Sequence, residues 1–294
     1  MSIRSWLTEN TASLLGKTVA ITGSTGGIGK ELCSYLASLG ANLVLVDRNP
    51  SKQETLISEL RVKHSGLSVR TVICDLEDID SVKSGTDILL EIGIDVFIHN
   101  AGAYSIPRHK CKAGFDNVYE INFVSPYYMI RRLLPMLDSR GGRVVVVGSI
   151  AHNYSKRDGD DIDFSTRTRA SLVYGNAKRY LMFSLYSLFD GRVGADLSVT
   201  HPGITFTGIT AHYPKLIYAI IKYPMKVIFM RPRRAALSVL RGIFEPTSRR
   251  EWIGPRFFSV WGLPKKKLLK TADDKEIHEI SRDAEKIYVS LCEK

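Results

Sequence analysis

The chain has 294 residues, of which 44% are hydrophobic and 24% are charged, the composition of an ordinary globular protein. Its four cysteines are scattered and form no Cys-x-x-Cys pair, which argues against a disulfide framework or a zinc site and indicates a reducing compartment. Residues 1–17 lack an apolar core, and no run reaches the roughly 18 apolar residues that a membrane span needs, so we expect a cytoplasmic protein.

The net charge of +11 is concentrated in one part of the chain. Residues 222–270 contain 13 Lys and Arg but only 2 Asp and Glu, whereas the rest of the chain balances to about zero. Any attraction to an anionic partner therefore belongs to this segment. Two interpretations are open: peripheral contact with an anionic membrane, since apolar residues accompany the charges, or an ordinary solvated basic face. We expect no nucleic-acid partner, because no recognition motif accompanies the charge.

A strand, a glycine-rich loop and a helix follow one another near the start of the chain. Residues 17–22 form a short β-branched run typical of a buried strand, and a helical pattern begins after the loop. The loop has the spacing Gly-x3-Gly-x-Gly, at Gly23, Gly27 and Gly29. Glycines let the backbone approach a ligand closely, and a helix N-terminus presents free N–H groups to a pyrophosphate. We predict a dinucleotide site here, with a glycine-rich turn that binds nothing as the alternative.

The next strand, residues 41–46, leads into Asp47 and Arg48. A carboxylate about 20 residues past the glycines can accept hydrogen bonds from both ribose hydroxyls of an adenosine, and it would repel a 2′-phosphate. Asp47 can also be no more than a turn residue. Arg48 acts in the opposite sense, because a guanidinium can face such a phosphate or stack on adenine. We favour NAD over NADP, and Arg48 keeps NADP open.

Later strands also end in polar or small residues. Asp75 can accept a hydrogen bond from an adenine amino group or simply fix a turn. The small residues of Asn100-Ala101-Gly102 leave room for a flat ligand, although Asn100 can equally fix its turn. Two further strand ends carry Ser149 and the group Pro202, Gly203, Thr205 and Thr207.

Apolar strands alternate with helices along the chain, and this pattern predicts an α/β fold with a parallel sheet covered on both faces, in one domain over residues 1–294. The carboxyl ends of such strands line one crevice where ligands bind. We expect one long helix over residues 115–137 with Asn122 inside it, where asparagine is unfavourable unless it has a buried role. We also expect a terminal amphipathic helix over residues 273–292.

Tyr174 and Lys178 lie four residues apart in a predicted helix, so their side chains point the same way. A lysine charge lowers the pKa of a neighbouring phenol and lets it exchange a proton with an alcohol or carbonyl. Taken alone, the pair has a second interpretation, because Tyr and Lys four residues apart are also common on ordinary helix surfaces.

Together these residues resemble the short-chain dehydrogenase/reductase family over roughly residues 15–260. The resemblance rests on an ordered set of motifs: Thr22-Gly23-x3-Gly27-x-Gly29, Asp75, Asn100-Ala101-Gly102, Asn122, Ser149, Tyr174-x3-Lys178 and Pro202-Gly203. The 25-residue separation of Ser149 from Tyr174 looks like the retinol dehydrogenase branch. His99 departs from the family's usual asparagine, and Ala177 from a frequent serine.

The resemblance implies a Rossmann-type doubly wound fold, a nicotinamide cofactor, either NAD or NADP, and a catalytic tetrad. Tyr174 would exchange the proton, Ser149 would polarise the carbonyl oxygen, and Lys178 would lower the tyrosine pKa and hold the ribose. Asn122 would keep a water that links Lys178 to solvent. Thr207, or less favourably Thr205, would bond the carboxamide. The implied cofactor-binding set also contains Ser24, Ile28 and Leu76.

In this family residues 208–231 should form the substrate lid. The segment is rich in apolar residues, which favours a lipophilic alcohol or carbonyl substrate such as a retinoid, a steroid or a lipid-like aldehyde; the alternative is a helix pair packed on the core. Homo-oligomers are common in the family. A competing function is a nucleotide-sensing regulatory protein of weak activity that acts on a partner or a membrane surface through its basic segment.

Overall fold

The computed structural model describes residues 2–205, 230–269 and 272–293. Its centre is an eight-stranded sheet in the order β3-β2-β1-β4-β5-β6-β7-β8. All neighbouring strands are parallel except β7 and β8, which form an antiparallel hairpin. The strands are β1 (Thr18–Thr22), β2 (Asn42–Asp47), β3 (Val69–Ile73), β4 (Val96–His99), β5 (Arg143–Val147), β6 (Asp196–Thr200), β7 (Glu251–Phe257) and β8 (Trp261–Leu268).

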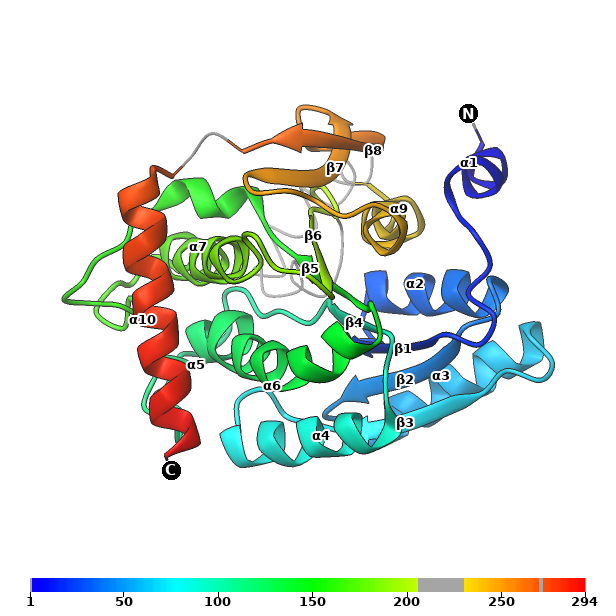
Figure 1. The fold of residues 1–294 in the computed structure, drawn as a ribbon, viewed down its shortest axis with the longest axis horizontal. Helices are drawn as coiled ribbons and strands as arrows, with labels where there is room; N and C mark the ends of the chain where they lie inside the picture. The colour runs from blue at the N-terminus through cyan, green and yellow to red at the C-terminus, as the bar shows by residue number, and fades with distance from the viewer. Residues whose placement is uncertain (1, 206–229, 270–271, 294) are drawn as a thin grey trace, which may run out of the picture.

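Helices cover both faces of this sheet (Figure 1). Helices α2, α3 and α9 share one buried cluster, and α4, α6 and α7 share the other. The helices are α1 (Ile3–Asn10), α2 (Gly27–Ser38), α3 (Pro50–Lys63), α4 (Ile79–Ile92), α5 (Asn117–Tyr119), α6 (Ser125–Ser139), α7 (Ala170–Leu188), α9 (Pro232–Phe244) and α10 (Asp274–Cys292), with a π-helix at Glu120–Val124 and a 3₁₀ turn at Ile150–Tyr154. The predicted doubly wound α/β fold is confirmed.

The predicted long helix over residues 115–137 corresponds to a continuous helical run over residues 117–139, but the run is not uniform, because a π-helix lies between α5 and α6. Pro126 has no N–H to offer the carbonyl of Asn122, four residues before it, so the regular helical ladder cannot continue there. The Asn122 side chain also enters the ladder, since its Nδ2 donates to the carbonyl of Val118 at 2.8 Å. The break thus turns a buried asparagine toward the C-terminal ends of the strands.

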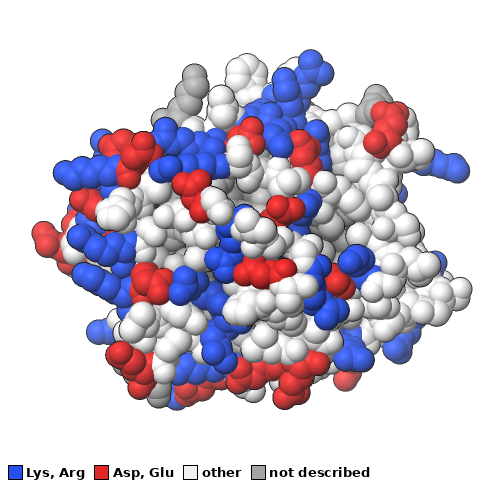
Figure 2. All heavy atoms as spheres, in the orientation of Figure 1, with Lys and Arg blue, Asp and Glu red and all other residues white. Residues whose placement is uncertain are grey.

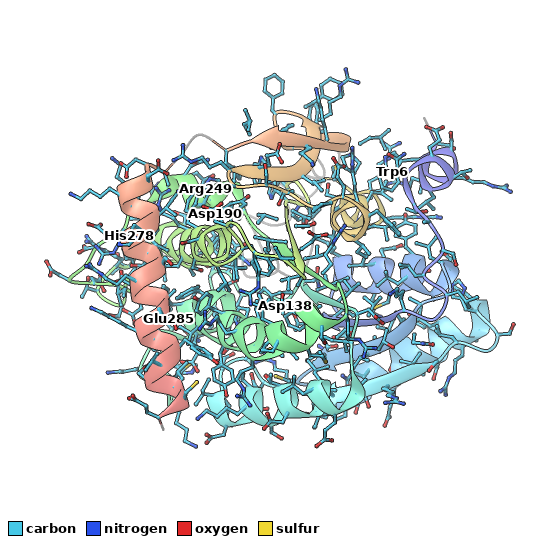
Figure 3. The ribbon with its side chains drawn as sticks, in the orientation of Figure 1. Trp6, Asp138, Asp190, Arg249, His278 and Glu285 are labelled. Carbon is cyan, nitrogen blue, oxygen red and sulfur yellow. The ribbon has the colours of Figure 1, made fainter. Side chains whose placement is uncertain are left out.

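Helix α10 confirms the predicted terminal amphipathic helix. Its apolar face is buried against α7 and α6: Ile277, Ile280, Ala284, Ile287 and Leu291. Charged contacts hold the same helix in place, since Glu276 accepts from the buried Arg179 of α7 at 2.7 Å and Glu285 accepts from Arg131 of α6 at 2.9 Å. Figure 3 shows Glu285 and His278 on the same helix.

Helix α1, helix α9 and the β7–β8 hairpin were not predicted from the sequence. Helix α1 docks through Trp6, whose buried side chain belongs to the same apolar cluster as residues of α2 and α9 (Figure 3). The β7–β8 hairpin, which is formed by part of the basic segment, adds two strands beyond β6 at one edge of the sheet. Among the described residues, no helix is long and apolar enough to cross a bilayer.

Candidate active site

The glycine loop between β1 and α2 is closely packed against backbone on both sides. Gly23 has a φ of +68°, and a Cβ added there would lie 2.8 Å from the Cα of Ala101. A Cβ added at Gly29 would lie 2.1 Å from the carbonyl oxygen of Gly23. Both positions therefore require glycine. Gly27 and Ile28 begin α2, so the loop delivers the chain directly to a helix N-terminus with its free N–H groups.

The loop after β4 is tied to the glycine loop by hydrogen bonds. The side-chain amide of Asn100 donates to the carbonyl of Gly23 at 2.9 Å and to that of Thr22 at 3.2 Å. The hydroxyl of Thr22 accepts from the backbone N–H groups of Asn100 and Ala101. Asn100 therefore fixes the turn, which is one of the two roles expected of it, and holds the two ligand-facing loops together.

Asp47 lies at the end of β2 with its carboxylate turned onto the glycine loop. It accepts hydrogen bonds from the hydroxyl of the buried Ser24 and, at 3.1 Å, from that of Thr25. Burial raises the pKa of Asp47, and these hydrogen bonds act in the opposite direction. The backbone N–H of Thr25 is a third donor, at 3.4 Å. A carboxylate has about four acceptor positions, so three donors from the loop leave room for one ribose hydroxyl.

Arg48 is engaged by acidic residues at the same end of the sheet. Its guanidinium lies 3.0 Å from a carboxylate oxygen of Glu77 and 3.9 Å from one of Asp75. Asp75 also accepts from the backbone N–H of Glu77 at 3.1 Å, so it fixes this turn as well. Leu76 between them is buried, and its carbonyl accepts from Ser125 at 2.8 Å. Arg48 is thus partly neutralised, which weakens the case for a 2′-phosphate.

The predicted tetrad comes from three separate parts of the fold. Ser149 follows β5 and caps the 3₁₀ turn, where its hydroxyl accepts from the backbone N–H of Ala151 at 3.2 Å. Tyr174 and Lys178 lie one turn apart on α7, with the lysine Nζ 5.7 Å from the centre of the tyrosine ring. Asn122 lies on the π-helix.

Gly102 lies against the side chains of two members of the tetrad, Asn122 and Lys178. A Cβ added there would lie 2.9 Å from the Oδ1 of Asn122 and 3.6 Å from the Nζ of Lys178. Both side chains are buried. Lys178 donates to the carbonyl of Val147 at 2.9 Å, and Asn122 donates through Nδ2 to Ala103 at 2.8 Å. The Oδ1 of Asn122 has no partner among the described residues, so a buried acceptor faces the lysine side of the site.

Burial sets the protonation of this pair. Desolvation lowers the pKa of Lys178 to about 7. Burial also raises the pKa of Tyr174 to about 12, while a hydrogen bond with Ser149 acts to lower it and Tyr104 to raise it. The expected lowering of the tyrosine pKa by Lys178 is therefore not met in this structure, because desolvation outweighs the hydrogen bond with Ser149.

The sixth strand brings Pro202 and Gly203 to the same edge. Gly203 has a φ of +82°, and a Cβ added there would lie 2.6 Å from the carbonyl oxygen of Val260. Thr205 pairs with Met230 in an isolated bridge. Thr207 and almost all of the expected lid at residues 208–231 lie outside the described residues.

Three residues of the site were not predicted from the sequence. Thr25 bonds Asp47, and Glu77 bonds Arg48, as described above. The ring of Tyr104 meets that of Tyr174 edge to face, with centres 5.3 Å apart. All three residues lie in loops, and they can be recognised as part of the site only because the structure places them next to predicted site residues.

These features suit a dinucleotide. Two obligatory glycines and a helix N-terminus form a cradle for phosphate, an acidic residue follows β2, and a buried acceptor and an amine of lowered pKa lie near a phenol. Among the described residues, no group of three or more His, Cys, Asp or Glu is arranged to hold a metal ion.

The short chain dehydrogenase family model matches residues 17–158 of the chain. Retinol dehydrogenase 12 of Mus musculus is 33% identical over 203 residues, which cover 66% of this chain and 63% of that protein. Retinol dehydrogenase 14 of Homo sapiens is 26% identical over 298 residues, covering 94% of this chain and 87% of that protein. The chain belongs to the short-chain dehydrogenase/reductase family.

Solved structures agree on the fold of this short-chain dehydrogenase. An uncharacterised protein from Mycobacterium paratuberculosis superposes with a TM-score of 0.75 at 21% identity, covering 96% of both chains. A Pseudomonas aeruginosa RhlG/NADP complex gives a TM-score of 0.60 at 22% identity, covering 80% of this chain and 91% of that one. The family consists of oxidoreductases that use NAD or NADP, and the resemblance to the retinol dehydrogenase branch is confirmed by its relatives.

Proposed function

We propose that this protein transfers hydride between NAD or NADP and an alcohol or carbonyl group of a lipophilic substrate. The observation that carries the proposal is the meeting of four polar residues at the carboxyl edge of the sheet. Ser149 hydrogen-bonds Tyr174, Lys178 lies one turn along the same helix, and Gly102 lies against the side chains of both Lys178 and Asn122.

Each residue has a definite task in this reaction. The cofactor supplies hydride chemistry when it is bound. Tyr174 gives its phenolic proton to the carbonyl oxygen during reduction and takes the alcohol proton during oxidation. Ser149 donates to the same oxygen and stabilises its developing negative charge.

Lys178 and a water held by Asn122 replace the proton that Tyr174 gives up. A lysine whose pKa lies at about 7 gains and loses a proton readily near neutral pH. The Oδ1 of Asn122, which has no partner among the described residues, faces the lysine side of the site and can anchor a water between Lys178 and solvent. We assign the cradle formed by Gly23, Ser24, Gly27, Ile28 and Gly29 to the cofactor phosphates, and Pro202, Gly203 and Thr205 or Thr207 to its nicotinamide end.

A lipophilic substrate is supported by two observations. The relatives include proteins named as retinol dehydrogenases and, in Homo sapiens, a polyprenol dehydrogenase that is 27% identical over 203 residues. The ring of Tyr104 meets that of Tyr174, and Tyr174 and Ile106 both pack against a buried cluster that contains Phe164. The lid that we assign to residues 208–231 would complete this apolar wall.

Peripheral contact of a cytoplasmic protein with an anionic membrane is part of the same proposal. The basic segment supports it only in part, because several of its charges are paired: Arg241 with Glu245, Lys266 with Glu245 and Glu251, and Arg249 and Arg250 with Asp274. Self-association, common in the family, is tested by the sedimentation measurement described below.

For the cofactor, we predict a preference for NAD that depends on Glu77. Replacing Glu77 by Gln removes the carboxylate that neutralises Arg48 and frees the guanidinium for a 2′-phosphate. We expect the NADPH dissociation constant to fall roughly fivefold, the gain of a modest charge-assisted contact, with NADH binding unchanged. Nucleotide fluorescence titration measures both constants. Glu91→Gln, an exposed position on α4, is the matched control, and an unchanged ratio of the two constants in Glu77→Gln would contradict the role given to Glu77.

The proposed reaction is tested by following NADH and NADPH oxidation with a panel of retinoid, steroid and small aldehyde or ketone substrates. Turnover that is faster with the lipophilic members supports the proposal. Nucleotide binding with no turnover of any carbonyl would instead favour the nucleotide-sensing alternative, which no observation described above favours.

A further inference from the structure

The turn of the β7–β8 hairpin exposes large apolar side chains. Phe258 is 92% exposed, Phe257 is 54% exposed and Trp261 is 48% exposed. These three residues lie within five positions at the outer end of the hairpin (Figure 1). Single exposed apolar residues are ordinary on protein surfaces, but three large ones together mark an interaction site.

The backbone of this turn does not suit the residues that occupy it. Phe258 and Ser259 have φ values of 50° and 58°, and the N–H of Val260 donates to the carbonyl of Phe257 at 2.9 Å. Two central residues with positive φ form the kind of hairpin turn that prefers Asn-Gly or Asp-Gly. A bulky phenylalanine in this conformation costs about 1 kcal/mol or more and gains nothing by burial in the protein. Neither local conformation nor packing against the part of the chain that the structure describes explains Phe258.

Positive charge surrounds these aromatic residues. Residues 252–268 contain Arg256, Lys265, Lys266 and Lys267 and no acidic residue. The guanidinium of Arg256 lies 5.8 Å from the centre of the Phe257 ring, and Lys265 is exposed beside the turn. Figure 2 shows Lys and Arg gathered at the top of the molecule, the end where Figure 1 draws the hairpin. Exposed aromatic side chains flanked by cations match the interface of a bilayer that contains anionic lipid.

The turn also lies beside the candidate active site. The carbonyl oxygen of Val260, the last residue of the turn, is 2.6 Å from the position that a Cβ on Gly203 would occupy. Gly203 follows β6 at the carboxyl edge of the sheet, where the tetrad also lies. A hairpin anchored in a membrane would therefore hold this edge close to the bilayer surface.

We propose that the turn formed by Phe257, Phe258 and Trp261 inserts into the interface of an anionic membrane and presents the active-site edge to lipid-dissolved substrate. The insertion deepens the proposed function and rests on the membrane contact included in it. The aromatic rings enter the headgroup region, and Arg256 and Lys265 contact the lipid phosphates.

Trp261 offers a direct measurement on the unmodified protein. The other two tryptophans, Trp6 and Trp252, are only 2% and 4% exposed, so a change of solvent is felt mainly at Trp261. We expect the emission of the protein to shift to shorter wavelength when vesicles of phosphatidylcholine and phosphatidylserine are added. Phosphatidylcholine vesicles should give a smaller shift, and Trp261→Phe should abolish it.

Phe258→Asn separates insertion from mere electrostatic attraction. Asparagine is favoured at this turn position, so the variant should melt at the same temperature as the unchanged protein or slightly higher. Burial of a phenylalanine ring is worth about tenfold or more in partitioning, so we expect vesicle flotation to fall by roughly that factor. Val193→Asn is the matched control, because Val193 is also 92% exposed but precedes β6 at the opposite edge of the sheet.

The outcomes distinguish insertion from the wider proposal. Flotation that is lost in Phe258→Asn and kept in Val193→Asn supports insertion. Equal flotation of all three proteins overturns insertion but leaves the peripheral membrane contact in place. Absence of flotation for the unchanged protein overturns both insertion and peripheral contact, and it leaves the proposed hydride transfer untested by this experiment and unaffected. Sedimentation without vesicles tests whether a second copy of the chain covers the turn instead. If the protein self-associates, Phe258→Asn abolishes the association and no vesicle binding is seen, then the turn is an interface between copies and insertion is overturned.

Discussion

Replacing Tyr174 by Phe should lower the rate of carbonyl reduction by about 10³-fold, the usual contribution of a positioned general acid. The substitution keeps the aromatic ring, including its edge-to-face contact with Tyr104, and removes only the hydroxyl that bonds Ser149. Because the glycine cradle is untouched, the dissociation constant of the nucleotide should stay within a few-fold. Steady-state rates and nucleotide fluorescence, measured on one preparation, check both expectations.

The matched control for this variant is Tyr154→Phe. Tyr154 ends the 3₁₀ turn that begins beside Ser149, but its side chain is 53% exposed. Removal of its hydroxyl should leave the rate close to that of the unchanged protein. Retained carbonyl reduction in Tyr174→Phe would show that another group supplies the proton, and it would contradict the assignment of Tyr174 as the proton donor.

Replacing Gly29 by Ala should weaken nucleotide binding by at least about 100-fold, which corresponds to about 2.7 kcal/mol. The added methyl group would lie 2.1 Å from the carbonyl oxygen of Gly23 and 2.8 Å from that of Ser24. Both atoms are backbone, so the loop itself must move to accept the change. The loop then no longer presents its N–H groups to the phosphates in the same positions.

Gly26→Ala is the control within the same loop. A Cβ at Gly26 would lie 3.4 Å from the same carbonyl oxygen, an ordinary contact, and its φ of −77° suits any residue. We expect near-normal nucleotide binding from this variant. Thermal melting by circular dichroism identifies any loss of folding in Gly29→Ala, and a folded Gly29→Ala protein that binds nucleotide normally would contradict the cradle.

Much of the fold could be predicted because its strands and helices carry strong local patterns. The alternation of apolar strands with helices along the chain indicated the parallel sheet that the structure shows. The four residues of the candidate tetrad could be singled out because their motifs lie in the family's order along the chain, and their catalytic roles stay predictions. Helix α7 then brings Tyr174 to Ser149, which lies 25 positions earlier in the chain.

Other features depend on contacts that no local pattern reveals. The π-helix at Asn122 arises from the missing N–H of Pro126 together with a side-chain bond to Val118. The β7–β8 hairpin was hidden because its strands contain Pro255, Pro264 and three successive lysines, which are poor strand formers.

The electrostatics of the site were also beyond sequence reasoning. The spacing of Tyr174 and Lys178 suggested a charged lysine beside an acidified phenol. In the structure, burial lowers the pKa of the lysine to about 7 and raises that of the tyrosine to about 12. Likewise, Arg48 is countered by Glu77, 29 residues away in the chain. Desolvation and long-range pairing depend on the whole fold, not on neighbours in sequence.

The most direct test of the central claim is the stoichiometry of the reaction. Reduced nucleotide should be consumed only in the presence of a carbonyl substrate, with one alcohol formed for each nucleotide oxidised, and Tyr174→Phe should suppress both together. Absorbance of the nucleotide and chromatography of the product measure the two quantities in a single sample. Nucleotide that binds but is never oxidised by any retinoid, steroid or small carbonyl would contradict the account.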